Sequence, residues 1–127
     1  MDAPRHEKRP RFETGKGRLS VWAEAIHAGG ELVVYIGGGD RPHVGGISLA
    51  RSGGHPVSFS LPGHMDYIIS SESASRISEA SGSACVVICG IHIDRATPEE
   101  IDSLITNSRK CVGMLLESLR PSPREAA

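Results

Sequence analysis

Three short segments of this sequence each begin at or near a glycine and contain a histidine. These segments hold the side chains best suited to chemistry. They are residues 37–43 (GGGDRPH), 61–66 (LPGHMD) and 90–97 (GIHIDRAT). Near neutral pH an imidazole can hydrogen-bond a ligand, move a proton or bind a metal ion. We therefore look for a functional site in these three segments first.

The first segment has the composition of an anion site. Its glycines, including Gly38 and Gly39, leave backbone N–H groups that can point at an anion. Arg41 can hold a phosphate through two hydrogen bonds. The segment is neither a Walker A loop nor a dinucleotide fingerprint, because the lysine and the glycine spacing are absent and a strand follows. A glycine-rich hairpin turn is the structural alternative, but Asp40 and His43 exceed what a turn requires.

The other two segments lie where a strand leads into a helix. His64 follows Gly63 at the start of a helix, where anions are favoured, although His64 can instead serve as a cap. His92 and Asp94 would share one face if the strand continues, with Thr97 beginning the next helix. Polar residues beyond the end of a buried strand often bind ligands, and a structural role for His92 is the alternative.

Catalytic chemistry receives less support from the sequence. Three converging histidines and a carboxylate would suit zinc or iron, so a small metal-dependent hydrolase using His43, His64, His92 and Asp94 remains an alternative. No HxH or HExxH motif is present, and we assign no metal ligand. No serine lies in a GxSxG elbow, and the three cysteines lie in apolar surroundings, so we assign no catalytic residue.

Hydrophobic periodicity predicts the elements that must position these segments. Alternation or apolar runs predict strands, and a spacing of three to four residues predicts helices. Gly82 is a helix stop, and Thr97, Pro98 and Glu100 form a helix start with a capping box. The serine-rich stretch 70–83 is interpreted as the polar face of the first helix. The predicted strands are 19–28, 31–37, 43–50, 57–62 and 84–91, and the predicted helices are 65–80 and 98–119.

The element order is therefore β-β-β-β-α-β-α. We expect an α+β fold with a mostly antiparallel sheet of about five strands and two helices packed on one face. Since the fifth strand follows a helix, it can return beside an earlier strand in parallel. We predict a disordered N-terminal arm over 1–17, a single domain over 18–120 and a frayed tail over 121–127.

Composition excludes several classes of function. The 127 residues carry a net charge of -1 and only 4% aromatic residues, which argues against a nucleic-acid binder. The odd number of cysteines argues against a disulfide framework. No signal peptide and no apolar run of membrane length is visible, so we expect a cytoplasmic protein with no membrane partner.

The ordered segments GGGDRPHVGGISLA, LPGHMD and GIHIDRATPEEI resemble the prenylated-flavin chaperones, the LpdD-like domains. The resemblance runs from about Arg18 to Leu119. It implies a non-catalytic protein that binds prenylated FMN and helps to supply it to a UbiD-type decarboxylase, with unmodified FMN as an open alternative ligand. The matching positions, together with Arg41, give the predicted cofactor site: Gly38, Gly39, Asp40, Arg41, His43, Gly63, His64, His92, Asp94 and Thr97.

In that site the glycines and Arg41 would hold the phosphate, and the histidines and Asp94 would face the ring edge or the ribityl hydroxyls. A carrier must shield a reduced flavin with apolar walls, and this chain has few aromatic residues to supply them. We therefore expect a homo-oligomer with a pocket at a subunit boundary. A structural accessory subunit that binds no cofactor remains a further alternative.

Overall fold

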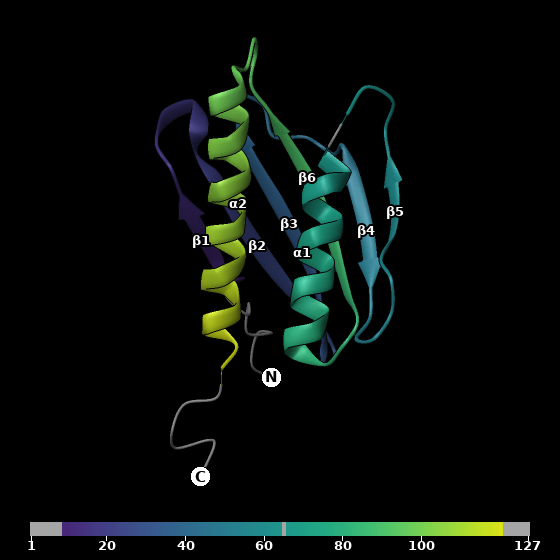
Figure 1. Cartoon of the computed structure of the whole chain (residues 1–127). Coiled ribbons are helices and arrows are strands. Elements are labelled where there is room, and N and C mark those ends of the chain that lie inside the picture. The colour runs from purple at the N-terminus through teal and green to yellow at the C-terminus, as the bar shows by residue number, and fades with distance from the viewer. Residues whose placement is uncertain (1–8, 65, 121–127) are drawn as a thin grey trace, which may run out of the picture.

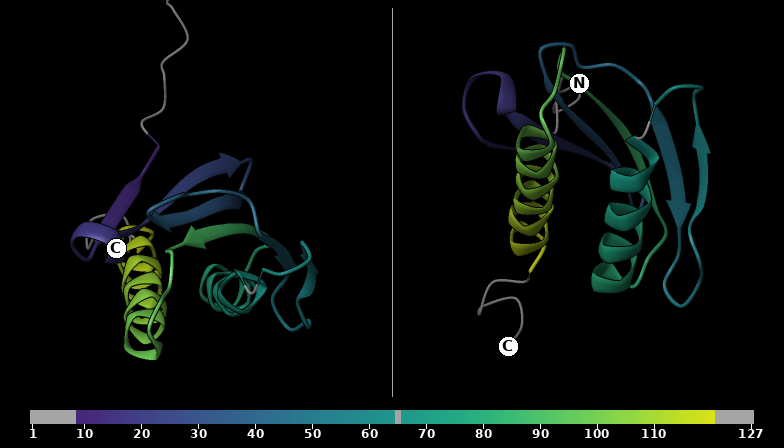
Figure 2. Two further views of the ribbon diagram at one scale, coloured as in Figure 1. Left: turned by 90° about the horizontal axis from the view of Figure 1, so that it is seen from above. Right: turned by 45° about the horizontal axis from the view of Figure 1, so that its top comes forward.

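The computed structural model describes residues 9–64 and 66–120, which form one mixed sheet with both helices on the same face (Figure 1, Figure 2). The sheet order is β1-β2-β3-β6-β4-β5. This arrangement confirms the predicted α+β class. The strands are β1 (Arg11–Thr14), β2 (Val21–Ala28), β3 (Glu31–Gly39), β4 (Gly46–Ala50), β5 (Val57–Ser60) and β6 (Cys85–His92), and the helices are α1 (Asp66–Ser81) and α2 (Pro98–Ser118).

One pair in the sheet is parallel. The chain returns through α1 so that β6 inserts between β3 and β4, parallel to β3 and antiparallel to β4. This confirms the expectation that the strand after the first helix can pair in parallel. The carboxyl ends of β3 and β6 consequently meet at the same edge, where Gly39 pairs with His92.

The sheet has six strands, one more than the prediction. The additional strand β1 lies inside the segment 1–17 predicted to be a disordered arm, and that prediction is wrong for residues 11–14. Phe12 packs against the core, and the Arg11 guanidinium lies 4.8 Å from the centre of the Trp22 ring. The sequence pattern does not indicate this strand, because its two charged residues alternate with the two residues that face the core. The segments 1–8 and 121–127 and the predicted helical residue Met65 lie outside the described residues.

Glycines 37–39 continue β3 and do not form the predicted loop. Glycine has a low strand propensity, but here β2 pairs on one side and β6 on the other. A side chain at Gly38 would collide with the backbone of Ser20 and Val21. These glycines therefore serve close packing within the sheet.

The helices begin and end as the sequence predicts. Thr97 caps α2 through a capping box with Glu100, Pro98 occupies its first turn, and Gly82 follows α1 with a φ of +71°. The serine stretch of α1 was predicted to be a polar face, but Ser70, Ser73 and Ser78 are buried. Small side chains allow α1 to lie close to the sheet, and Ser70 shares a 2.7 Å hydrogen bond with the buried Ser48 of β4.

The core lies between the sheet and the two helices, and it contains the three cysteines as free, buried thiols. This confirms the predicted core role of the cysteines. Burial raises the pKa of the Cys85 thiol to about 12 and the pKa of Cys89 well above its ordinary value. Neither helix in the described part of the chain is long and apolar enough to cross a membrane.

Candidate functional site

The site lies at the edge where β3 and β6 end and both helices begin (Figure 1). To reach β4 from β3, the loop 40–45 crosses the end of β6. The backbone N–H of His43 donates to Gly90 O at 3.3 Å, and that of Gly45 donates to Cys89 O at 2.9 Å. A side chain at Gly90 would overlap the His43 backbone, so the absence of one lets the loop pass.

The backbone amides that were predicted to bind an anion already donate hydrogen bonds to backbone carbonyls. Gly39 N–H donates to Ser20 O at 3.0 Å, and the amides of Asp40 and Arg41 both donate to His92 O at 2.8 and 3.2 Å. The expectation of free N–H groups in this segment is therefore wrong. Sequence cannot show this, because the acceptor carbonyls lie on distant segments.

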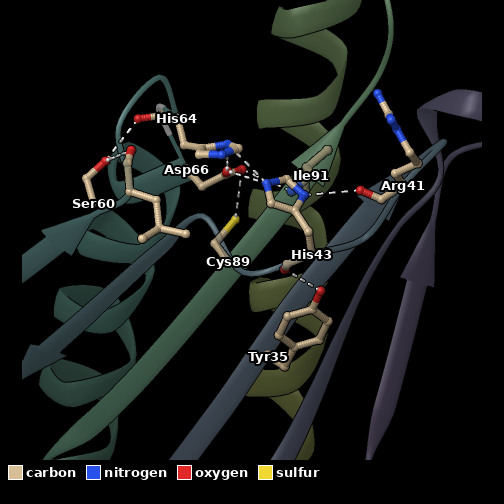
Figure 3. A network of polar contacts seen from close by, with 9 residues as sticks. Tyr35, Arg41, His43, Ser60, His64, Asp66, Cys89 and Ile91 are labelled. Atoms are coloured by element: carbon tan, nitrogen blue, oxygen red, sulfur yellow. Dashed lines mark hydrogen bonds and ion pairs between the residues drawn. The ribbon is translucent and has the colours of Figure 1, made fainter.

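Two of the predicted histidines are brought together with a third group that the prediction omitted (Figure 3). His43 Nε2 lies 3.2 Å from His64 Nδ1 and 3.3 Å from Asp66 Oδ2, and His64 Nδ1 lies 3.9 Å from the same oxygen. These two imidazoles and one carboxylate, from the crossing loop and the start of α1, form the histidine–aspartate cluster.

Asp66 is the best-anchored member of this cluster. Its side chain is only 7% exposed. Its Oδ1 accepts a hydrogen bond from the Ile91 backbone N–H at 3.0 Å and lies 3.8 Å from Cys89 Sγ. The sequence signal that could have found it is a carboxylate two residues after His64, at a predicted helix start.

The remaining predicted polar residues form the rim of the site. Asp94 Oδ1 accepts from His92 Nε2 and from the Arg41 guanidinium, both at 2.9 Å. The hydrogen bond from His92, and then the charge of Arg41, lower the pKa of the Asp94 carboxyl. The His92 and His43 ring centres are 6.3 Å apart. His92 and Asp94 are in contact, although β6 ends at His92 and the strand does not continue to Asp94, the condition on which the predicted shared face depended.

The other predicted site residues occupy packed, helix-capping or exposed positions outside the cluster. Gly38 and Gly39 are packed inside the sheet, and the Thr97 side chain accepts from Glu100 N–H as a helix cap. The carboxylate Oδ2 of Asp40 lies 3.9 Å from Arg18 Nε on the exposed surface. The structure thus brings together Arg41, His43, His64, His92 and Asp94, with Gly63 close by.

Tyr35 holds the crossing loop in place. Its hydroxyl donates a 2.7 Å hydrogen bond to the His43 carbonyl (Figure 3). Burial raises the pKa of this phenol, and the nearby Cys89 and Asp66 raise it further. His43 is fixed a second time, because its Nδ1 lies 3.1 Å from the Arg41 carbonyl.

An apolar cavity of about 310 Å³ opens beside the cluster, between the starts of the two helices. Its polar border is formed by His64, Asp66 and His92. A second, contiguous hollow of about 280 Å³ shares His64 and His92 with it and adds Arg41 and His43. The apolar walls are mainly isoleucines from α1, from α2 and from the end of β6 and the residue after it, namely Ile68, Ile69, Ile91, Ile93, Ile101 and Ile105.

These walls correct one step of the sequence argument. We expected a single chain to lack apolar walls because it has few aromatic residues, but aliphatic side chains supply them here. A larger cavity of about 700 Å³ lies at the other end of the helices, and it is bordered by Arg76, Glu117 and Arg120. It contains none of the predicted site residues.

Residues 15–120 match the family described as the prenylated flavin chaperone LpdD-like domain. The chain belongs to this family. Its sequence is 24% identical over 120 residues to Protein LpdD of Lactiplantibacillus plantarum. This match covers 91% of this chain and 88% of that protein. The predicted resemblance is therefore confirmed.

The fold also resembles that of a solved structure titled "Crystal Structure of a Novel Chaperone Complex for Yeast 20S Proteasome Assembly". The TM-score is 0.61 at 14% identity, and the match covers 89% of this LpdD-like chain and 98% of that one. Membership in a family of chaperones supports a chaperone or accessory role and a non-catalytic protein, as the sequence predicted.

Proposed function

We propose that this LpdD-like protein binds prenylated FMN without transforming it and helps to deliver or maintain the cofactor of a UbiD-type decarboxylase. The observation that carries the proposal is the apolar cavity bordered by histidines and close to an arginine. Ligand pockets typically combine apolar walls with a few polar groups that orient the ligand, and they span roughly 300–1,000 Å³. The family description agrees with this ligand.

The cavity volume suggests how the cofactor lies. About 310 Å³ is at the small end of ligand pockets, so we place the fused rings and the prenyl-derived ring among the isoleucines. The phosphate then lies outside, near Arg41. Because the loop amides are engaged, the Arg41 guanidinium replaces the glycine backbone as the proposed phosphate ligand. It would exchange its exposed partner Asp94 for the phosphate.

An anaerobic titration tests this proposal. Reduced prenylated FMN and, separately, FMN are added to the purified protein, and binding is followed by absorbance and fluorescence. We expect saturable binding of the prenylated form. Arg41→Ala and His92→Ala should each weaken it by about tenfold, the size of one charge-assisted hydrogen bond. Ile101→Asn, at a wall position that is 47% exposed, should weaken the prenylated form more than FMN.

Matched controls separate the site from the rest of the surface. Arg51→Ala and His27→Ala remove an exposed arginine and an exposed histidine that lie outside the site, and both should leave binding unchanged. If the wild-type protein binds neither flavin but co-purifies with a decarboxylase, the structural accessory subunit becomes the better description.

We further propose that the chain forms a homo-oligomer through the sheet face that carries no helix (Figure 2). We call this the bare sheet face and define it by eight outward residues of four adjacent strands, which exclude Glu31 at the start of β3. None of them is charged, so a second copy of the same face is a complementary partner. They are Val33 and Tyr35 of β3, Val86 and Ile88 of β6, Ile47 and Leu49 of β4, and Val57 and Phe59 of β5.

A further inference from the structure

We propose that His43, His64 and Asp66 bind a divalent first-row transition metal ion. Their three donor atoms form a triangle with sides of 3.2, 3.3 and 3.9 Å. A four-coordinate ion with metal–ligand distances of about 2.0–2.1 Å holds its donor atoms about 3.3 Å apart. Two sides of the triangle therefore match one face of such a coordination sphere, and the 3.9 Å side exceeds the ideal separation by about 0.6 Å.

The hydrogen bonds behind two of the three ligands, His43 and Asp66, favour the same conclusion. His43 Nδ1 lies 3.1 Å from the Arg41 carbonyl, which can only accept a hydrogen bond, so Nδ1 donates and Nε2 is the ring nitrogen directed at the cluster. Metal-binding histidines commonly donate their second N–H to a carbonyl in this way. Asp66 uses Oδ1 for the Ile91 amide, which leaves Oδ2 directed at the histidines.

Charge supplies a further argument. Asp66 is 7% exposed, and in the described part of the chain its only ion-pair partners are the two histidines. His43 Nε2 and the buried carboxylate oxygen approach to 3.3 Å, an arrangement that a cation bound between them stabilises. A shared proton joins two atoms, whereas a divalent ion can bind all three donors together.

The donor set also defines the class of ion. Two imidazoles and one carboxylate suit zinc, iron, manganese or cobalt, whereas calcium and magnesium prefer sites made of oxygen ligands. Three protein ligands leave coordination positions open. His43 and His64 border the hollow that also contains Arg41 and His92, so these positions face a space that a ligand can enter.

Metal binding is measured without any flavin, so its outcome is independent of the proposed function. Protein treated with a chelator is titrated with Zn²⁺ by calorimetry and with Co²⁺ by visible absorption. We expect one ion per chain and a Co²⁺ spectrum with imidazole ligands. His43→Ala, His64→Ala and Asp66→Asn should each weaken binding by at least a hundredfold, and millimolar Mg²⁺ or Ca²⁺ should not compete.

The control is the double variant His27→Ala/His55→Ala, which removes two exposed histidines outside the cluster and should bind as the wild type does. Circular dichroism shows whether each variant is folded. Since the Co²⁺ spectrum of the wild type needs no variant, it remains decisive if a variant unfolds. The absence of stoichiometric binding, or equal loss in the His27/His55 control, would overturn the proposal.

Discussion

Gly90 is the residue on which the geometry of the site depends most directly. The loop 40–45 crosses β6 at this position, and the His43 backbone occupies the space that a side chain would need. The neighbouring atoms are backbone atoms in a loop fixed by Tyr35 and by four amide hydrogen bonds to β6. They cannot move aside without breaking those contacts.

Gly90→Ala should therefore destabilise the protein by about 1–3 kcal/mol, the usual cost of overpacking, and displace His43 from Asp66. Urea unfolding measures the first effect, and Co²⁺ binding measures the second. Gly30→Ala is the matched control, because its added methyl group meets no atom within 4 Å. Equal stability of the two variants would show that the crossing loop is not tightly fixed.

At this scale the sequence predicts residue types better than their roles. The predicted cofactor site included His43, His64 and His92, and the structure brings these three side chains close together. The role of Gly39 was not predictable, since its amide reaches Ser20, 19 positions earlier in the chain. Asp66 was missed because its partner Ile91 lies 25 positions away.

The two helices are joined by an ion pair on their exposed side. Arg109 of α2 donates two hydrogen bonds to Glu72 of α1, at 2.6 and 3.0 Å. These hydrogen bonds lower the pKa of Glu72 below its ordinary value of 4.5. The pair adds stability above that value, and the contribution is lost as the pH falls through the lowered pKa.

A double-mutant cycle with Glu72→Gln and Arg109→Met isolates this contribution. At pH 7 the coupling should be favourable but small, because both side chains are solvent-exposed and screened. As the pH falls below the lowered pKa of Glu72, the coupling should approach zero, since the carboxylate becomes protonated. A coupling that is the same at both pH values would mean that the pair contributes nothing through charge.

Elements were predictable where local chemistry determines them. The capping box at Thr97 and the stop at Gly82 fixed helix ends correctly. Strand β1 was missed because four residues with two charges carry too little periodicity, and it is held by pairing with β2. The buried serines of α1 were misassigned because serine is polar, while close packing on β4 favours its small size.

The whole molecule exposes an unusually apolar sheet surface. On the bare sheet face Phe59 is 70% exposed and Leu49 is 52% exposed, and both lie opposite the side covered by the helices. Contiguous apolar surface of this kind marks interaction sites in proteins. A second copy would bury it.

The double variant Leu49→Glu/Phe59→Glu should therefore convert a dimer into a monomer without unfolding the chain, because both side chains are already exposed. Light scattering measures the mass, and circular dichroism measures the fold. Met114→Glu, on α2, is the control and should remain dimeric. A wild-type protein that is monomeric at high concentration would contradict the proposed homo-oligomer.

Because the site is assembled from distant segments, a ligand bound there would also stabilise the folded chain. Arg41 and Asp94 meet across 53 positions, so an unfolded chain has no site to offer. A ligand that binds only the folded state adds RT ln(1 + [L]/Kd) to the unfolding free energy, about 2.7 kcal/mol when its concentration is a hundred times Kd. Proteases that attack the unfolded chain would then spare loaded molecules and remove empty ones. The abundance of the carrier would thereby follow the supply of what it carries.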